Sequence, residues 1–244
     1  MKAKLIAVTK PLIEGLDSIY DLVSFCARIS NPSNQMNTAT AEKLIAYLLK
    51  YKHFSPFEMV NCVVEVEAPR DIARQLLRHR SFSFQEFSQR YADVATLGDS
   101  FITRPARKQD TKNRQNSLDF DMTEEEDRFI CAEWLNKQNE ILELVAESYK
   151  WAIDAGIAKE VARTILPEGL TMSRLYVNGN LRSWLHYIEV RTEEGVTQLE
   201  HVELARLIAQ AIAEAFPQIT NFVTPSTRGT STRYKESSEL YRNR

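Results

Sequence analysis

Glycine is scarce in this chain, and it is spread thinly along it. The 244 residues include seven glycines, and no two of them lie close together. A backbone turn that cradles a phosphate needs several glycines within a few residues, as in the G-x-G-x-x-G turn of dinucleotide-binding folds or in a phosphate loop. Neither turn can be built here. If the chain binds a nucleotide, side chains, chiefly those of arginine, must hold the phosphates.

The composition is that of an ordinary globular protein. Hydrophobic residues make up 43% and charged residues 26% of the chain, and a chain of this length can bury its apolar surface in one core. No run of about 18 apolar residues occurs, so we expect no membrane span. Residues 1–8 lack the apolar stretch of a signal peptide and are typical of a first strand.

The cysteines and the charge balance narrow the functional classes further. Cys26, Cys62 and Cys131 are odd in number and form no C-x-x-C pair, which argues against a disulfide framework and against a cysteine-based zinc site. We therefore expect a cytoplasmic protein, in the host cytoplasm if the chain is viral, and no metal. The formal net charge of −2 argues against a general nucleic-acid binder, which usually carries an excess of basic residues.

The hydrophobic pattern predicts a single α/β domain of the α+β kind, with a mixed sheet and several helices. Alternating or β-rich segments predict strands over 4–9, 62–67 and 172–177. Apolar residues at helical spacing predict helices over 17–29, 40–49, 69–80, 123–155, 180–190 and 196–216, and a short helix that ends at Leu166. Residues 92–121 have no period and are predicted to be a polar insertion. The domain is expected to cover 1–221, followed by a flexible tail over 222–244.

Three local patterns set the expected helix boundaries. Pro69 has the position of a first helical residue, because proline lacks only an N–H that the first turn leaves unpaired. Thr38 or Thr40 is placed to cap the helix that follows it. Thr123 and Glu126 have the spacing of a capping box at the start of the longest helix.

Arginines gather in residues 70–91. Five arginines stand there against two acidic residues, and the stretch 78–91 also holds four aromatic rings. The planar guanidinium group suits phosphate, which it grips with two parallel hydrogen bonds, and aromatic rings can stack on a flat ligand. The simpler alternative is a solvated basic helix end followed by an ordinary loop. A third hypothesis is that residues 70–91 and 104–114 grip an RNA or DNA backbone, with binding that weakens steeply with salt.

Four segments, in order, resemble the flavin-dependent thymidylate synthases, and the match runs from about residue 4 to about 217. Arg78-His79-Arg80, followed after seven residues by Ser88, is similar to the family signature, although Gln85 stands where many members have asparagine. The stretches 84–91 and 112–117 look like the viral and cyanobacterial branch. The other three similar elements are His53 to Glu58, Glu160 to Pro167, and Asn180 to Arg191.

The resemblance implies a fold, a reaction and an assembly. The family fold is α/β, and it forms a homotetramer whose active sites are shared between subunits. Members make dTMP from dUMP, with the carbon from methylenetetrahydrofolate and the hydride from FAD that NADPH has reduced. The implied partners are these small molecules, with no nucleic acid and no membrane.

The resemblance also assigns site residues. FAD would contact Ser55, Arg78, His79, Arg80, Glu86, Asn180, Leu181, Arg182 and His186. The substrate dUMP would contact Gln75, Leu76, Leu77, Arg78, Glu86, Phe87, Ser88, Gln89, Arg90, Arg163 and Arg191, partly from a neighbouring chain. Arg191 would be catalytic, because a fixed cation beside the uracil ring favours the ring anion and raises the electron density at C5.

Each of these roles has a simpler alternative. Arg163 could pair with Glu160 on the same short helix, Arg191 could only complement the dipole at a helix end, and His186 could be a half-buried structural histidine. A thymidylate synthase with a cysteine nucleophile is disfavoured, because none of the cysteines has a histidine neighbour in sequence. A family member that has lost activity and serves as a scaffold is the remaining alternative.

Overall fold

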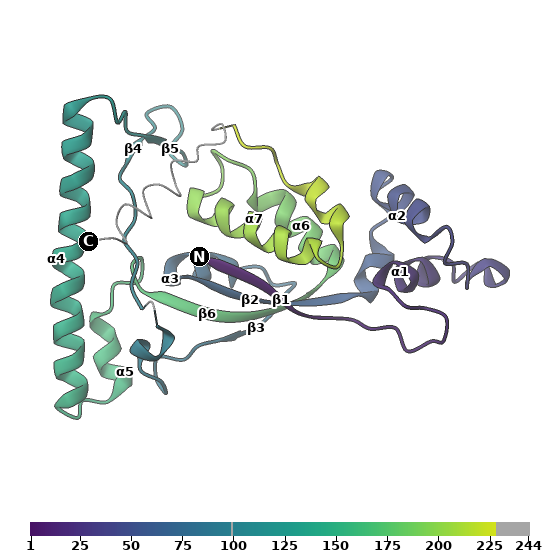
Figure 1. The fold of residues 1–244 in the computed structure, drawn as a ribbon, viewed down its shortest axis with the longest axis horizontal. Coiled ribbons are helices and arrows are strands. Elements are labelled where there is room, and N and C mark those ends of the chain that lie inside the picture. Colours follow the sequence, from purple (N-terminus) through teal and green to yellow (C-terminus); the bar gives the residue numbers. More distant parts are fainter. Residues whose placement is uncertain (99, 228–244) are drawn as a thin grey trace.

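The computed structural model describes residues 1–98 and 100–227. An antiparallel four-stranded sheet with the order β1-β2-β6-β3 lies at its centre, formed by β1 (Lys2–Val8), β2 (Asn61–Pro69), β6 (Met172–Asn180) and β3 (Ser83–Glu86) (Figure 1). The two central strands pair along their whole length, from Asn61 opposite Asn180 to Pro69 opposite Met172. All three strands predicted from the sequence are present, and β3 is an addition to them. Every pairing in this sheet is antiparallel, so the expected mixture of parallel and antiparallel strands was wrong.

The alternation of residues in β2 gives the strand one apolar face and one charged face. Cys62, Val64 and Val66 are fully buried, whereas Glu65 and Glu67 point to the opposite face. There, Arg174 of β6 forms ion pairs with both carboxylates, at 3.5 and 3.2 Å. One face of the sheet is therefore apolar and must be covered, and the other carries charged side chains.

Helices α6 (Leu181–Arg191) and α7 (Leu199–Ala213) cover the apolar face (Figure 1). They bury Trp184, Tyr187 and Ile208 completely, in one core with the strand residues. At one end of the elongated molecule, α1 (Ile19–Ala27) and α2 (Ala41–Lys50) pack against each other. The Ser18 side chain and Asp21 form a capping box at the start of α1, whereas Thr40 precedes α2 without a side-chain cap and instead accepts a hydrogen bond from Arg28.

The predicted helix over 69–80 is shorter than expected. Helix α3 covers Arg70–Leu76, and Pro69 is the last residue of β2 and the N-cap of α3 rather than its first residue. Residues 77–82 form turns that lead into β3. The predicted helix over 196–216 is also shorter than expected, because α7 covers Leu199–Ala213, and a separate 3-10 helix follows over Pro217–Phe222.

The polar insertion over 92–121 contains a small hairpin, formed by β4 (Arg107–Gln109) and β5 (Ser117–Asp119). It leads into α4 (Glu125–Asp154), a helix of 30 residues that stands across one end of the molecule (Figure 1). The predicted capping box is absent, since Glu124 is the N-cap without a side-chain bond and Thr123 donates to Asp121 instead. Gly156, with φ of 80°, follows the end of α4. The short α5 (Lys159–Ala162) and a 3-10 turn over Arg163–Ile165 come next.

Residues 224–227 follow the core and bind to it. The backbone N–H of Thr224 donates to Thr192 Oγ1, and both Ser226 and Thr227 donate to the Glu194 carboxylate. The rest of the predicted tail, 228–244, lies outside the described residues. Among the residues that the structure describes, no helix combines the length and the apolar character needed to cross a membrane.

Candidate active site

The turn that contains Arg78, His79 and Arg80 lies beside the C-terminal end of α6. Arg191, the last residue of this helix, donates a hydrogen bond from Nε to His79 Nε2 at 2.9 Å. His79 is half-buried, whereas Arg78 and Arg80 expose their side chains. A contact across 112 residues of sequence therefore joins two of the segments that carry the family resemblance.

Burial and the neighbouring positive charges keep His79 neutral. Burial lowers the pKa of His79 to about 4, with further lowering by the Arg191, His186 and Arg78 charges. A neutral imidazole has one acceptor nitrogen, which here faces Arg191. Within residues 1–98 and 100–227, no carboxylate lies within ion-pair distance of Arg191. Its guanidinium is held through Nε and keeps its charge uncompensated.

Buried aromatic rings pack against His79, which accepts the hydrogen bond from Arg191. The His79 ring meets the Tyr187 ring edge-on at 5.0 Å, and Phe82 lies 4.3 Å from Trp184 between ring centroids. Gly179 of β6 lies directly against Phe82, since a Cβ atom there would stand 2.2 Å from Phe82 Cδ1. The turn after α3 is thus fixed on the core and has one position relative to α6.

A second group of predicted residues lies at β3 and the segment that follows α5. Glu86 accepts a hydrogen bond from Ser173 at 2.9 Å and faces the guanidinium of Arg70 at 3.6 Å. Arg90 pairs with Glu160 at 3.3 Å. The alternative pair of Glu160 with Arg163 is therefore not formed, and the positive charge of Arg163 instead helps to lower the pKa of Arg70, although burial is the main cause.

A third group surrounds the N-terminus of α6. The Asn180 side chain caps this helix by accepting from the backbone N–H of Ser183 at 2.8 Å. Arg182 pairs with Glu58 at 3.2 Å, and Glu58 belongs to the same 3-10 helix, Ser55–Met59, as the predicted Ser55. His186 is exposed, so the interpretation of His186 as a half-buried structural histidine was wrong.

The remaining predicted residues differ in how far they can reach a ligand. Leu76 and Leu181 are fully buried in the core, so only their main-chain atoms could contact one. Leu77, Phe87 and Ser88 are half-buried. Gln89 is 4% exposed, and its Nε2 has no hydrogen-bond partner among the described residues. A buried amide nitrogen without an acceptor costs free energy, so the segment 86–90 holds a donor that none of the described residues satisfies.

Sequence reasoning missed two polar side chains, His201 and Tyr187, that join these elements to the predicted Gln75. Gln75 of α3 accepts from the buried His201 ring and donates to Gln198, both at the start of α7. The Tyr187 hydroxyl forms a hydrogen bond with Nε2, the other ring nitrogen of His201. In the sequence, His201 and Tyr187 are interior positions of helical patterns, so no local signal sets them apart.

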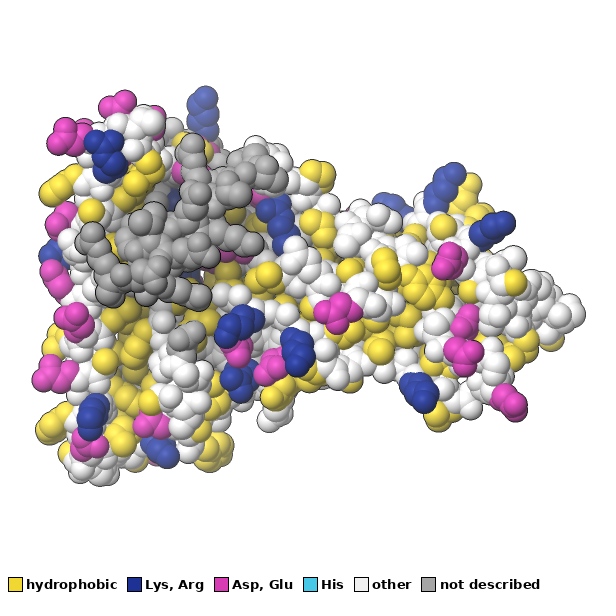
Figure 2. Space-filling view, in the orientation of Figure 1, with side chains coloured by type: hydrophobic (Ala, Val, Ile, Leu, Met, Phe, Trp, Pro, Cys, Tyr) yellow, Lys and Arg dark blue, Asp and Glu magenta, His cyan; other side chains and the backbone are white. Residues whose placement is uncertain are grey.

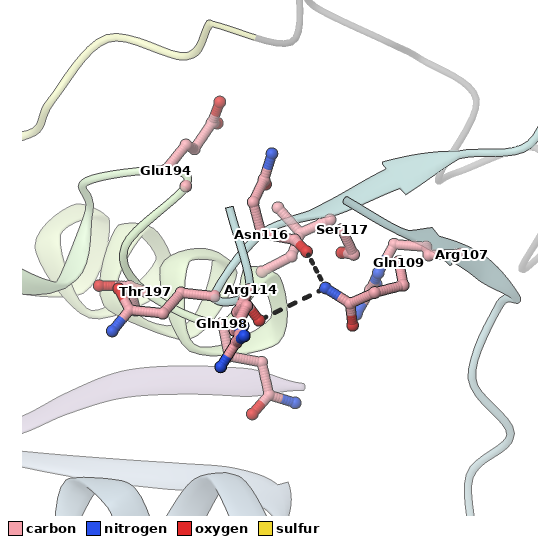
Figure 3. A pocket seen from close by; sticks show the side chains of 11 residues that line it. Arg107, Gln109, Arg114, Asn116, Ser117, Glu194, Thr197 and Gln198 are labelled. Atoms are coloured by element: carbon pink, nitrogen blue, oxygen red, sulfur yellow. Dashed lines mark hydrogen bonds between the residues drawn. The ribbon is translucent and has the colours of Figure 1, made fainter. Parts of the chain in front are cut away.

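A pocket of about 290 Å³ lies between the β4–β5 hairpin and the turn before α7 (Figure 3). Gln109 braces the hairpin by donating to the carbonyls of Arg114 and Asn116, and Asn113 donates to the Gly195 carbonyl at 2.6 Å. The basic residues of this insertion are largely engaged, in pairs of Arg104 with Asp71, Arg107 with Glu200, and Lys108 with Asp127. This pairing argues against the hypothesis that residues 104–114 grip a nucleic-acid backbone.

Comparison with known proteins identifies the family. A sequence model of the family described as "Thymidylate synthase complementing protein" matches residues 12–218. A protein of Paramecium bursaria Chlorella virus 1 called "Probable flavin-dependent thymidylate synthase" is 46% identical over 219 residues, which are 90% of this chain and 97% of the relative. The chain belongs to the flavin-dependent thymidylate synthase family. It is therefore an enzyme of this family, as the resemblance had predicted.

Two further comparisons place the chain within the flavin-dependent thymidylate synthases. The enzyme of this name from Synechocystis is 42% identical over 90% of the chain and 97% of its own length, and with the viral relative it confirms the predicted similarity to the viral and cyanobacterial branch. The crystal structure of the UMP/dUMP methylase PolB from Streptomyces cacaoi bound with 5-Br dUMP has a TM-score of 0.71 and 27% identity, and covers 91% of this chain and 93% of PolB. The predicted α+β fold is confirmed.

Proposed function

We propose that the chain catalyses the reductive methylation of dUMP to dTMP. The C5 proton of dUMP is lost, and C5 bonds to the methylene carbon of methylenetetrahydrofolate. The two bonds from that carbon to folate nitrogens break so that tetrahydrofolate leaves, and a hydride completes the methyl group. Bound FAD, reduced by NADPH, would supply that hydride. The observation that carries the proposal is Arg191, a cation with no carboxylate partner among the described residues, held by a neutral His79 beside the Arg78–Arg80 turn.

The residues predicted for FAD have the chemistry that a dinucleotide requires. Arg78 and Arg80 are exposed cations without a carboxylate partner in the described part of the chain, and Arg182 is a third cation at the start of α6. Guanidinium groups can bind the two phosphates in place of a glycine-rich turn. The exposed Ser55 and the helix N-terminus capped by Asn180 offer further donors beside Arg182, whereas the Arg78–Arg80 turn lies beside the C-terminal end of α6.

The residues predicted for dUMP fall into two groups within one chain. Arg78 and Arg191 lie beside His79 at the end of α6, and Gln75 contacts His201 and Gln198 at the start of α7, whereas Glu86 and Arg163 lie near Arg70. A site that needs both groups is well served by a homotetramer in which a neighbouring chain contributes one of them. The unsatisfied Nε2 of Gln89 supports a ligand at residues 86–90, and Arg90 and Arg163 would neutralise the nucleotide phosphate.

Arg191 would act on the uracil ring by electrostatics. Neutral uracil is a weak carbon nucleophile at C5, and a cation next to the N3 side of the ring favours the anionic form. Arginine stays protonated at every working pH, and the hydrogen bond from Nε to His79 leaves the two terminal nitrogens to face the ring. His79 would thus orient the group that activates the substrate.

A cysteine nucleophile is not needed for this proposal, and the environment of the cysteines supports its absence. Burial raises the pKa of the Cys62 thiol to about 12, and burial also raises the pKa values of Cys26 and Cys131. Each thiol is therefore protonated at neutral pH, and a protonated thiol is a weak nucleophile. All three are free cysteines, which also suits a reducing cytoplasm.

The test combines a spectrum with an assay. The purified protein should show the visible absorption of a flavin, or acquire it with added FAD. With dUMP tritiated at C5, it should release tritium when FAD, NADPH and methylenetetrahydrofolate are all present, and omission of any one should stop the release. A protein that binds no FAD and releases no tritium in the complete mixture would rule the function out.

A further inference from the structure

A chain of hydrogen-bonded side chains runs through the interior from α6 to the hairpin. The Tyr187 hydroxyl lies 3.1 Å from His201 Nε2, and His201 Nδ1 lies 3.1 Å from Gln75 Oε1. Gln75 Nε2 donates to Gln198 Oε1 at 2.6 Å, and Gln198 Nε2 donates to Glu200 at 3.0 Å. Tyr187 and His201 are both fully buried, so no water competes for the bond between them, and the bonds of Gln75 and Gln198 are partly buried.

The carboxylate at the end of this chain fixes the direction of every bond in it. Burial opposes the charge of Glu200, but Arg107 at 2.6 Å and hydrogen bonds outweigh burial and lower the pKa of this carboxyl group. An ionised carboxylate only accepts hydrogen bonds. Gln198 must therefore donate to Glu200 through its nitrogen, so its oxygen faces Gln75 and accepts from the Gln75 nitrogen.

The same logic continues to the tyrosine. Because the Gln75 nitrogen is directed toward Gln198, its oxygen faces His201 and needs a donor there. His201 must therefore carry its proton on Nδ1, which leaves Nε2 as an acceptor for the Tyr187 hydroxyl. Burial lowers the pKa of His201 to about 3, with further lowering by Arg191 and His79, which agrees with a neutral ring that has one donor and one acceptor.

We propose that His201 and Tyr187 are positioning residues that hold the Gln75 carboxamide in a single orientation for dUMP. The inference rests on the proposed role of Gln75 in binding this substrate. A carboxamide can rotate by half a turn and exchange its donor with its acceptor, and the two orientations differ little in shape. Gln75 is locked, because the reversed amide would place its NH2 group against the Nδ1–H of His201 and its oxygen against the oxygen of Gln198.

The hydrogen bonds that fix Gln75 also lead to the contact between His79 and Arg191. Tyr187 touches His79 through an edge-on ring contact at 5.0 Å, and His79 accepts the hydrogen bond from Arg191. Gln75 and Arg191 are two predicted substrate contacts from different helices. Each is therefore connected to the buried Tyr187, Gln75 through His201 and Arg191 through His79. A ligand that touches both would meet groups whose relative positions the core determines.

The first test measures substrate affinity. In Tyr187→Phe, His201 Nε2 loses its donor, and in His201→Leu, Gln75 loses its partner, so a fraction of the molecules holds the amide reversed. The dissociation constant and the KM for dUMP should rise about three- to tenfold, the cost of about one hydrogen bond, with kcat nearly unchanged. His201→Asn should recover most of the affinity that His201→Leu loses, since the amide N–H of asparagine stands near the position of Nδ1.

Matched controls separate positioning from general destabilisation. Tyr149→Phe also removes a buried tyrosine hydroxyl, but on α4, and should change neither the dissociation constant nor the KM. Calorimetric titration with dUMP measures binding without turnover, and melting curves identify the variants that are folded. If folded Tyr187→Phe and His201→Leu bind dUMP as tightly as the wild type while Gln75→Ala binds weakly, the inference is wrong.

A spectroscopic measurement tests directly which ring nitrogen of His201 carries the proton. The ¹⁵N chemical shifts of the His201 ring should show a proton on Nδ1 and a bare Nε2 in the wild type, and a proton on Nε2 would overturn the inference. If Gln75→Ala also leaves dUMP binding unchanged, the role of Gln75 falls and the positioning role falls with it. The proposed function would still stand in that case, because it depends on flavin binding and tritium release.

Discussion

Arg191 is oriented through Nε, so its charge and its geometry can be separated by mutation. Arg191→Ala removes both, and Arg191→Lys keeps a cation but loses the planar fork and the hydrogen bond to His79. We expect tritium release to fall by about 10²–10³-fold in Arg191→Ala, and less in Arg191→Lys. The flavin absorption should persist in both, because Arg191 itself is not among the predicted flavin contacts. Full activity in Arg191→Ala would exclude the electrostatic role.

His79 should make the stability of the protein depend on pH in a defined interval. Its pKa is about 4 in the folded protein against 6.5 ordinarily, so between these values the unfolded chain binds more protons. The contribution of His79 is complete above pH 6.5 and is lost as the pH falls through 4. The free energy of unfolding of His79→Gln should therefore fall less over this interval than that of the wild type.

Urea denaturation at several pH values between 4 and 7 measures this difference. The exposed His53 supplies a control variant, His53→Gln, whose stability curve should stay parallel to that of the wild type. If His79→Gln also gives a parallel curve, the neutral His79 does not contribute to the pH dependence of folding.

At this scale the sequence indicates candidate residues but not the contacts between them. Arg78, His79 and Ser88 could be selected together, because the spacing of the family signature is local, and Arg191 was selected from the separate element Asn180 to Arg191. The bond between His79 and Arg191 joins residues 112 positions apart, and no periodicity encodes it. The pair of Arg182 with Glu58 and the chain through His201 depend in the same way on how α6 and α7 pack on the sheet.

At the scale of elements, the close packing of β6 on the turn after α3 gives the next prediction. Gly179 leaves no room for a side chain, since a Cβ atom would stand 2.2 Å from Phe82 Cδ1. Gly179→Ala should displace the Phe82 ring from Trp184 and lower the free energy of unfolding by about 1–3 kcal/mol. Gly169→Ala is the matched control, because no heavy atom lies within 4 Å of its Cβ position. Equal denaturation midpoints for the two variants would contradict this account.

The elements that the sequence misplaced share a physical reason. Helix α3 ends at Leu76 because the Arg78–Arg80 turn is held by Arg191 and by the buried aromatic rings, which outweighs the helical propensity of its residues. Strands β4 and β5 have three residues each and are mostly polar, too short for a period to be visible. Long, strongly periodic elements such as α4 and β2 were predicted, because their pattern repeats many times.

At the scale of the whole molecule, α4 carries an apolar stripe that the described chain does not cover. Ile130, Trp134, Ile141, Leu144 and Trp151 fall on the a and d positions of a heptad. All are at least 39% exposed, and Leu144 and Trp151 reach 64 and 65%. Figure 2 shows hydrophobic side chains among acidic ones at the edge where α4 runs. Contiguous exposed apolar surface of this kind marks an interface, so we expect a second copy of the chain to pack on it in the proposed homotetramer.

Leu144→Glu tests this assignment, because it places a charge in the middle of the stripe without touching the core. Light scattering after size exclusion should give a smaller assembly than for the wild type. Ala146→Glu adds the same charge to the same helix at an exposed position off the stripe and should leave the assembly intact. If active sites are shared between subunits, tritium release should fall together with the assembly in Leu144→Glu, since Arg90 and Arg163 would no longer reach a neighbouring Arg191. An unchanged mass for Leu144→Glu would mean that the subunits meet elsewhere, whereas a smaller assembly with full activity would mean that each chain builds a complete site.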